Sequence, residues 1–380
     1  MNSSNLDNIK IIPDEISENA VHLVCTQNGK TLSGGTFRTY RAHLNGAVVD
    51  TMAVCGIGTP PENRRFGLVR KLLAESSRIA NEKNCILSVL HPFSFAYYRK
   101  FGYERVSDTR ILEFPMTALN FMPRCSDFSR CKEEDIPALD EVYNKFSAKR
   151  NLLFPRNGNF NYRIPDEAKL TYISSDEDGT PDAYVTLSIE NYFYVNRMVS
   201  VNLNVFEMAF TSPAALDKVL GFLRMFEGQL ESVKIHDCGM MPEVERRLRN
   251  YRHTKITVIP DVMARINDVE AVLNAVEYPS APGEFTVKVF EPEGTSHLSE
   301  KTTGIWNVRY CGKKAAVTRL PDGSDYDFSA DIPAFTQLVF GYECHGIESA
   351  RYIHNTEFKN ECEDFFRAFY NRPAGVFEHF

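Results

Sequence analysis

The stretch IGTPPENRRFGLVRKLL, Ile57–Leu73, connects a strand-like run to an amphipathic helix through a loop with two adjacent arginines. The first N–H groups of a helix have no intrahelical partner, and the helix start carries a partial positive charge. Guanidinium groups, here those of Arg64 and Arg65, bind phosphate oxygens in bidentate pairs. Gly67 has no Cβ, so a ligand can approach its backbone closely. The loop therefore predicts a pyrophosphate-binding site at the start of a helix.

This loop differs from two common nucleotide-binding loops. It lacks the G-K-[ST] ending of a nucleotide P-loop and the G-x-G-x-x-G pattern of a dinucleotide-binding fold. The alternative is an ordinary charged helix start, in which Arg64 and Arg65 are solvated. The segments on either side of the loop decide between these two interpretations.

The first third of the chain predicts alternating strands and helices. Apolar or alternating runs indicate strands at residues 20–27, 31–44, 47–59, 85–92 and 110–116. A helix is expected over residues 62–83, because one face carries Phe66, Val69, Leu73, Ser76 and Ala80. A short aromatic helix, SFAYYRKFG, is expected over residues 94–102. Residues 1–20 form a short polar region before the first clear strand.

The rest of the chain continues in the same α/β (α+β) manner. In the second segment, helices are expected at residues 134–148 and 212–226, and strands at 182–190, 199–210 and 231–236. This order resembles that of the first segment, which indicates a divergent repeat. In the third segment, helices are expected at residues 267–276, 331–341 and 359–371, and strands at 284–291, 304–311 and 314–320.

Length and composition limit the class of protein. The 380 residues exceed the ~250–300 of a single core, so two or three domains are expected. A net charge of -7 argues against nucleic acid as the main partner. Nine cysteines without a C-x-x-C pair indicate reduced thiols, and Cys344-His345 has no further ligands at metal-site spacing. With no signal peptide and no apolar run of ~18 residues, a cytoplasmic protein without membrane contact or metal is expected.

The motifs RRFGLV and YYRKFGY, with the strand and helix between them, resemble the GNAT superfamily of acetyl-CoA-dependent N-acetyltransferases. Arg64, Gly67 and Val69 match its [QR]-x-x-G-x-[GA] loop, although valine replaces the usual small residue. RRFGLVRKLL and YYRKFGYE are most similar to the enhanced intracellular survival (Eis) family. That resemblance implies two tandem GNAT-type domains, residues 1–121 and 122–260, each with a mixed sheet flanked by helices. It implies a sterol-carrier-protein-like α+β domain at residues 261–380.

The resemblance also implies site residues. Ile57 and Thr59 match the strand positions whose backbone pairs with the pantetheine arm of acetyl-CoA. The pyrophosphate would be held by Arg64, Arg65, Phe66, Gly67, Leu68 and Val69. Tyr98 matches the general acid of the family, and a phenol with a pKa near ~10 can protonate a departing thiolate. Tyr98 could instead be one of several core aromatic residues, and Tyr97 is the next candidate acid.

The general base in the family is the terminal carboxylate of the chain, here that of Phe380 in the ending VFEHF. Glu378 and His379 are the alternatives, and a frayed terminus without a role is a third. The second domain reads FTSPAALDKVLGF at its strand–helix junction, without the arginine pair or the loop glycine. We therefore expect acetyl-CoA only in the first domain, and the second domain to shape the acceptor pocket.

Family resemblance implies aminoglycosides, polyamines or lysine-type amines as acceptors, and a homo-oligomer that is often hexameric. The short region 1–20 departs from the longer helical opening that usually helps line the acceptor site. A rival interpretation is a non-catalytic protein that binds an apolar ligand in the third domain. A scaffold protein is a further alternative, which no motif supports.

Overall fold

The computed structural model describes residues 9–158, 168–194, 197–236, 238–292, 300–370 and 372–378. The chain divides into two compact units, each described by itself below. The first comprises the described residues of Met1–Ser107 and Asp261–Arg372, together with Glu378. The second comprises those of Asp108–Pro260 and Pro373–Phe377.

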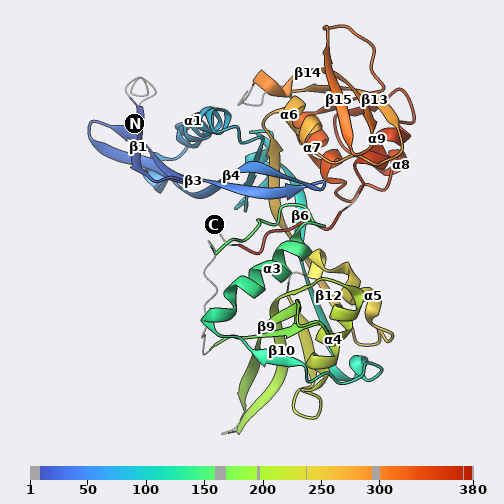
Figure 1. Cartoon of the computed structure of the whole chain (residues 1–380). Helices are drawn as coiled ribbons and strands as arrows, with labels where there is room; N and C mark the ends of the chain where they lie inside the picture. The colour runs from blue at the N-terminus through green and yellow to red at the C-terminus, as the bar shows by residue number, and fades with distance from the viewer. Residues whose placement is uncertain are drawn as a thin grey trace. The chain divides into compact units, whose positions relative to one another are not determined.

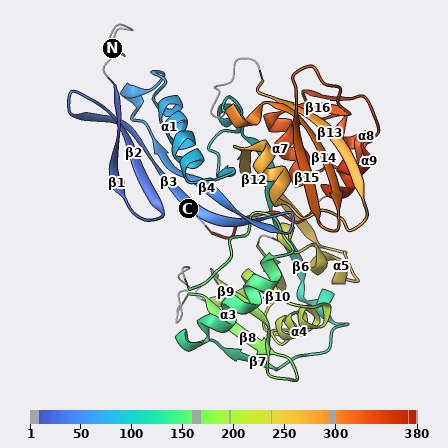
Figure 2. The ribbon, with the colours of Figure 1, turned by 45° about the horizontal axis from the view of Figure 1, so that its top comes forward.

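The first unit contains the sheet that carries the arginine loop. Its strands, in spatial order, are β1 (Lys10–Ile16), β2 (Ala20–Gln27), β3 (Lys30–Leu44), β4 (Ala47–Gly58), β5 (Leu87–Leu90) and β12 (Lys255–Ile266). β1 to β4 are antiparallel neighbours, β5 runs parallel to β4, and β12 runs antiparallel to β5. Helix α1 (Leu68–Glu82) packs along one face of β1–β4 (Figures 1 and 2). This order places the loop between β4 and α1 at the carboxyl end of β4.

Two local predictions for this unit were wrong. Helix α1 begins at Leu68, after a 3₁₀ turn η2 (Pro61–Asn63), so the expected start at residue 62 is too early. The backbone explains this, because Arg65 and Gly67 have positive φ angles of 66° and 71°, which no α-helix contains. Residues Lys10–Ile16, expected as part of a polar lead, form β1. Five of its last six residues are exposed, so the apolar alternation that indicates a strand is missing.

A separate five-stranded sheet also belongs to the first unit. Its order is β15 (Lys314–Leu320), β14 (Gly304–Cys311), β13 (Gly283–Phe290), β16 (Phe328–Asp331) and β17 (Thr356–Phe358). Its helices are α6 (Val269–Ala275), α7 (Ile332–Phe340), α8 (Ile347–Ala350) and α9 (Glu363–Ala368). The sequence predicts β13 to β15 and the three longer helices. A sterol-carrier-protein-like domain stays a prediction.

The second unit has a sheet of the same kind. Its order is β6 (Glu104–Pro115), β11 (Ser232–Ile235), β10 (Arg197–Phe210), β9 (Pro181–Tyr194), β8 (Leu170–Ser175) and β7 (Phe128–Arg130). Helices α3 (Ile136–Ser147) and α4 (Pro213–Arg224) pack on β9 and β10, and α5 (Pro242–Arg247) follows β11. As in β4–α1–β5, the unit β10–α4–β11 joins two parallel strands through a helix.

The last strand of each repeat pairs in the other unit. β6 follows α2 (Phe95–Arg99) of the first unit, yet its residues Leu112–Pro115 pair with β11 in the second. β12 follows α5 of the second unit, and its residues Met263–Ile266 pair with β5 in the first. Neither pairing has a local sequence signal. The domain boundaries expected at residues 121 and 260 stay predictions.

Candidate functional site

A cavity of about 920 Å³ lies in the first unit at the carboxyl end of β4. It is lined by Ile57, Thr59, Asn63, Arg64, Arg65, Gly67, Leu68, Val69, Arg70, Phe93, Tyr97, Lys100 and Phe101. Seven of these are predicted cofactor residues, so the structure brings that set together around one space. Phe66 is not among these lining residues; its half-buried side chain packs against the core of the same unit.

The loop that borders the cavity is held in shape by specific hydrogen bonds. Buried Asn63 donates from Nδ2 to the carbonyl of Leu32 over 3.2 Å, which ties η2 to β3. Arg64 donates from Nε to the carbonyl of Thr59 over 3.1 Å. This bond orients Arg64, which lines the cavity, through its inner nitrogen. The loop thus presents Arg64 and Arg65 on a defined backbone rather than on a loose turn.

The first turn of α1 has the features of an anion site. Its N-cap is Gly67 with φ 71°, and among the described residues no side chain caps this end. The first intrahelical bond runs from Lys71 N–H to the Gly67 carbonyl, so Leu68, Val69 and Arg70 begin the helix without a capping side chain. Such N–H groups bind phosphate readily. In the second unit, by contrast, the Ser212 side chain accepts a bond from Ala215 N–H and caps α4.

The edge of β4 is open beside the cavity. Only Thr51, Met52 and Ala53 pair with β5, whereas β4 continues to Gly58. On its other side β4 stays paired with β3 up to Gly58. Ile57 and the following Thr59 lie at the end of this edge and line the cavity. An unpaired strand edge presents N–H and C=O groups that can pair with an extended amide chain.

The two candidate tyrosines occupy different positions on α2. The Ser94 side chain accepts the N–H of Tyr97 over 3.3 Å and caps this helix. Tyr97 is half-buried and lines the cavity. Tyr98 is only 4% exposed, belongs to the core, and is not among these lining residues. Its ring packs at 5.5 Å from the rings of Phe93 and Tyr97, and at 6.1 Å from that of Tyr103.

Burial controls the acidity of both phenols. Burial is the main cause that raises the pKa of Tyr98 well above its usual value, and neighbouring Tyr103 and Tyr97 raise it further. Burial also raises the pKa of Tyr97, against a smaller lowering by Arg70. Both side chains therefore carry their proton at neutral pH, as a general acid must.

Some lining residues were missed by the sequence analysis. Arg70, in the first turn of α1, adds a third guanidinium, and its spacing from Gly67 in RRFGLVR is a signal that could have identified it. Lys100 and Phe93 come from the α2 region, and only the tertiary structure places them at the cavity. The cavity thus has four cationic side chains, and no carboxylate is among its described lining residues.

The predicted base Phe380 and its alternative His379 lie outside the described residues. The segment before them, Pro373–Phe377, is fixed within the second unit. Asn151 N–H donates to the Pro373 carbonyl over 2.8 Å, and Gly375 N–H donates to the Asn151 carbonyl over 3.2 Å. Phe377 packs 6.3 Å from the ring of Tyr143. The end of the chain is therefore anchored up to Phe377.

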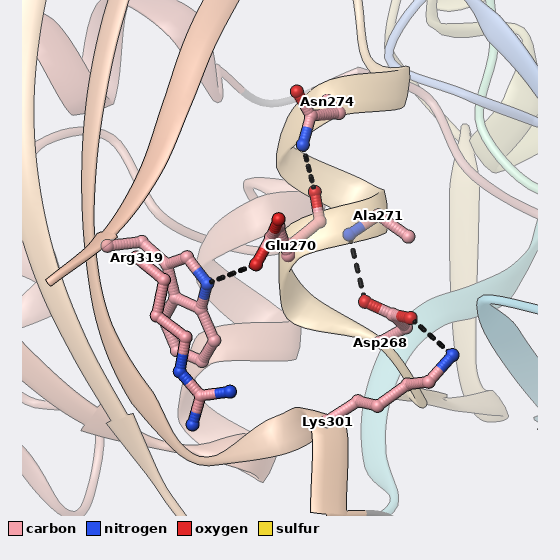
Figure 3. Close-up of a pocket in the computed structure, with 7 residues that line it drawn as sticks. Asp268, Glu270, Ala271, Asn274, Lys301 and Arg319 are labelled. Carbon is pink, nitrogen blue, oxygen red and sulfur yellow. Dashed lines mark hydrogen bonds and ion pairs between the residues drawn. The ribbon is translucent and has the colours of Figure 1, made fainter.

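A second cavity of about 360 Å³ lies beside α6 in the first unit (Figure 3). Asp268 caps α6 through Ala271 N–H and forms a 2.9 Å ion pair with Lys301. Glu270 accepts a bond of 3.4 Å from the indole N–H of Trp306. These charged side chains are paired with neighbouring groups, and the cavity is lined by none of the predicted site residues. In the described part of the chain, no cluster of His, Cys, Asp and Glu could hold a metal, and no helix could cross a membrane.

The chain is similar to known acetyltransferases in sequence and in structure. Residues 8–106 match the acetyltransferase (GNAT) domain family, and no curated protein matches the sequence. A GCN5-related N-acetyltransferase from Anabaena variabilis is 18% identical, with a TM-score of 0.78 over 94% of this chain and 89% of that chain. A probable N-acyltransferase from Enterococcus faecalis is 16% identical, with a TM-score of 0.79 over 95% and 90%. Eis1 from Mycobacterium abscessus is 15% identical, with a TM-score of 0.77 over 94% and 91%.

At these identities the solved structures establish the fold alone, whereas the family match covers the residues that form β1 to β5, the arginine loop and α2. Residues 8–106 are therefore an acetyltransferase (GNAT) domain, and the predicted GNAT-type N-acetyltransferase with an Eis-like fold is confirmed.

Proposed function

We propose that this protein transfers the acetyl group of acetyl-CoA directly to a primary amine, with the cofactor bound in the cavity of about 920 Å³. GNAT acetyltransferases use acetyl-CoA as co-substrate. The observation that carries the assignment is the uncapped start of α1 beside Arg64 and Arg65. A diphosphate there receives backbone N–H groups and guanidinium groups together. Arg70 and Lys100 supply further positive charge for the remaining phosphate of CoA.

The open edge of β4 supports the orientation of the cofactor. The pantetheine arm contains two amides, which can pair with backbone groups at Ile57 and Thr59 in the manner of an added strand. This pairing would direct the thioester from the arginine loop toward α2. The arginine loop would then hold the diphosphate, the edge of β4 the pantetheine arm, and the α2 region the thioester.

The proposed reaction needs an acid and a base. The neutral amine nitrogen attacks the thioester carbon and the C–S bond breaks, with the sulfur taking the proton of the Tyr98 phenol. The nitrogen then loses its second proton, which restores the phenol and leaves the amide and the CoA thiol. An alkylammonium group has a pKa near ~10, so the acceptor must lose a proton before its nitrogen can attack. The Phe380 terminal carboxylate would take that proton. The anchored segment Pro373–Phe377 supports a defined place for this end of the chain.

Tyr97 is a second candidate for the acid, because it lines the cavity while Tyr98 is buried. Phenylalanine variants at each position distinguish them. We expect Tyr98→Phe to lower kcat by about 100-fold or more, with acetyl-CoA affinity retained, and Tyr97→Phe to keep most of the turnover. The reverse result would assign the proton to Tyr97.

The acceptor class is proposed as aminoglycosides, polyamines or lysine-type amines. Calorimetry with acetyl-CoA, followed by a CoA-thiol release assay with a panel of these amines, tests the function. Submicromolar to micromolar binding and thiol release with at least one amine are expected. Failure to bind acetyl-CoA would overturn the cavity assignment. The rival function, an apolar ligand carrier, is not favoured, since the described cavity beside α6 is lined mainly by polar and charged side chains.

A further inference from the structure

A fully buried ion pair lies against the turn that follows α2. The Arg265 guanidinium on β12 is 0% exposed and forms a 2.5 Å contact with Glu291, whose side chain is 1% exposed. Thr302 donates from its hydroxyl to the same carboxylate over 2.6 Å. Arg265 also donates from Nη1 to the carbonyl of Phe101 over 3.1 Å. A buried guanidinium is thus fixed on one side and holds the α2 turn on the other.

This turn is hydrogen-bonded to the backbone of Tyr98. The Tyr98 carbonyl accepts the N–H of Phe101 over 2.9 Å and that of Tyr103 over 3.4 Å. Between them, Gly102 has a φ of 78°, a conformation that favours glycine. A Cβ at Gly102 would lie 1.8 Å from Nη1 of Arg265, so the close approach of the guanidinium also requires glycine. The FGY motif therefore has a physical reason here, which is contact with Arg265.

The α2 helix cannot hold its own position. It has five residues, far fewer than the ~12–15 that make an isolated helix stable. Its N-terminal end is held by the Ser94 cap, and its C-terminal end by Arg265. A buried ion pair generally contributes less to stability than well-packed apolar residues of similar volume. Fixing the α2 turn is therefore a better explanation for Arg265 and Glu291 than stability alone.

We propose that Arg265, oriented by Glu291, is a positioning residue for acetyl transfer: it holds the Phe101–Tyr103 turn and thereby sets the position of Tyr98. This inference rests on the proposed role of Tyr98 as the acid. It assigns a function to the five-stranded sheet of the first unit, because Glu291 follows β13 and Thr302 precedes β14. The sheet would thus supply the Glu291 carboxylate, which orients Arg265 and so fixes the Phe101–Tyr103 turn.

The test uses the full-length protein and the double variant Arg265→Met/Glu291→Met. Removing both charges leaves no unpaired buried ion, so the variant is expected to fold. We expect kcat to fall by about 10- to 100-fold, as for a misplaced catalytic group. The Kd of acetyl-CoA, measured by calorimetry, should stay within about threefold, because the arginine loop is untouched. Tyr278→Phe is the matched control, since it removes a buried side-chain hydrogen bond of the same unit, from the Tyr278 hydroxyl to the Leu273 carbonyl, and leaves Arg265, Glu291 and the turn residues in place.

A mutant cycle with Tyr98→Phe separates the possible outcomes. If Arg265 acts through Tyr98, the triple variant should be no slower than Tyr98→Phe alone. If Tyr98→Phe is slow but the two effects multiply, the positioning role is overturned while the acid assignment stands. If Tyr98→Phe is fully active, the acid assignment fails and this inference fails with it. A kcat for Tyr278→Phe as low as that of the Met/Met variant would also overturn the inference, because loss of any buried polar contact in this unit would then explain the effect.

Discussion

Arg64 and Arg65 present two guanidinium groups at one cavity, and Arg64 is oriented by the Thr59 carbonyl. Replacing both with alanine removes the groups proposed to hold the diphosphate. Charge-assisted hydrogen bonds contribute ~1.5–3 kcal/mol each. We therefore expect acetyl-CoA to bind Arg64→Ala/Arg65→Ala about 100-fold more weakly or worse, measured by calorimetry. Arg78→Ala, which removes an exposed arginine of α1 that is not among the lining residues of the cavity, is the control. Equal affinity for both variants would contradict the loop assignment.

The sequence predicted single residues of this cavity well where a motif carried them. Ile57 and Thr59 were implied by the family resemblance, and the loop arginines were predicted from their place before a helix. Both signals are local in the sequence. Lys100 and Phe93 could not be predicted, because only the tertiary structure brings the α2 region to the cavity. Phe66 shows the opposite limit, since the motif includes it but its side chain turns to the core.

His43 carries a pH-dependent contribution to stability. Burial, the main cause, and the nearby Arg41 lower the pKa of His43 to about 4. A lowered folded-state pKa stabilises the fold above the unfolded pKa of about 6.5, and this stability is lost as the pH falls toward 4. We expect His43→Gln to remove at most about 3 kcal/mol of the pH dependence between pH 7 and 4. Urea unfolding of the variant and of the unmodified protein at several pH values measures this, and an equal pH dependence of the two would contradict it.

At the scale of elements, the junction between loop and α1 can be tested with a pair of glycines. Gly67 and Gly29 have φ angles of 71° and 76°, and a Cβ would meet no atom of the described residues at either position. Each alanine substitution should therefore lower the free energy of unfolding by about 1 kcal/mol through backbone strain alone. Only Gly67 lines the cavity, so only Gly67→Ala should also weaken acetyl-CoA binding. Thermal unfolding and calorimetry on both variants give the comparison, and equal affinities would show that nothing approaches the Gly67 backbone.

Elements with strong apolar patterns were predicted correctly, and the short ones were not. The strands from β2 to β5 and the helices α3 and α4 carry the periodicity of a buried face. β1 is mostly exposed, and β16 and β17 have only four and three residues, so their sequences contain too little pattern. The premature start predicted for α1 has a different cause, because Phe66 matches the helical stripe although Arg65 and Gly67 turn the backbone.

At the scale of the whole molecule, the sequence predicted the repeat but not its strand exchange. The element order strand–helix–strand is visible twice along the chain. The pairing of β6 with β11 and of β12 with β5 depends on tertiary structure alone. The ion pair of Arg265 with Glu291 in the first unit likewise has no sequence motif that predicts it.

The end of the chain offers a test that separates anchoring from catalysis. Removing residues 378–380 leaves the hydrogen bonds of Asn151 with Pro373 and Gly375, and the packing of Phe377, in place. This truncation should lose much less thermal stability than removal of the whole anchored segment, and it should bind acetyl-CoA normally. It should nevertheless lose at least about 100-fold in kcat, because the proposed base is absent.

Truncation after Arg372 is the matched comparison for that test. It also removes the partners of Asn151, which is 0% exposed, and the packing of Val376 and Phe377. Unsatisfied buried backbone groups cost ~1–3 kcal/mol each, so the midpoint of thermal unfolding should fall clearly. A protein ending at Phe377 that keeps full thiol release would exclude Phe380, His379 and Glu378 as the base. In that case the proton would have to leave the amine by a group of the acetyltransferase domain itself, or the amine would have to bind already neutral.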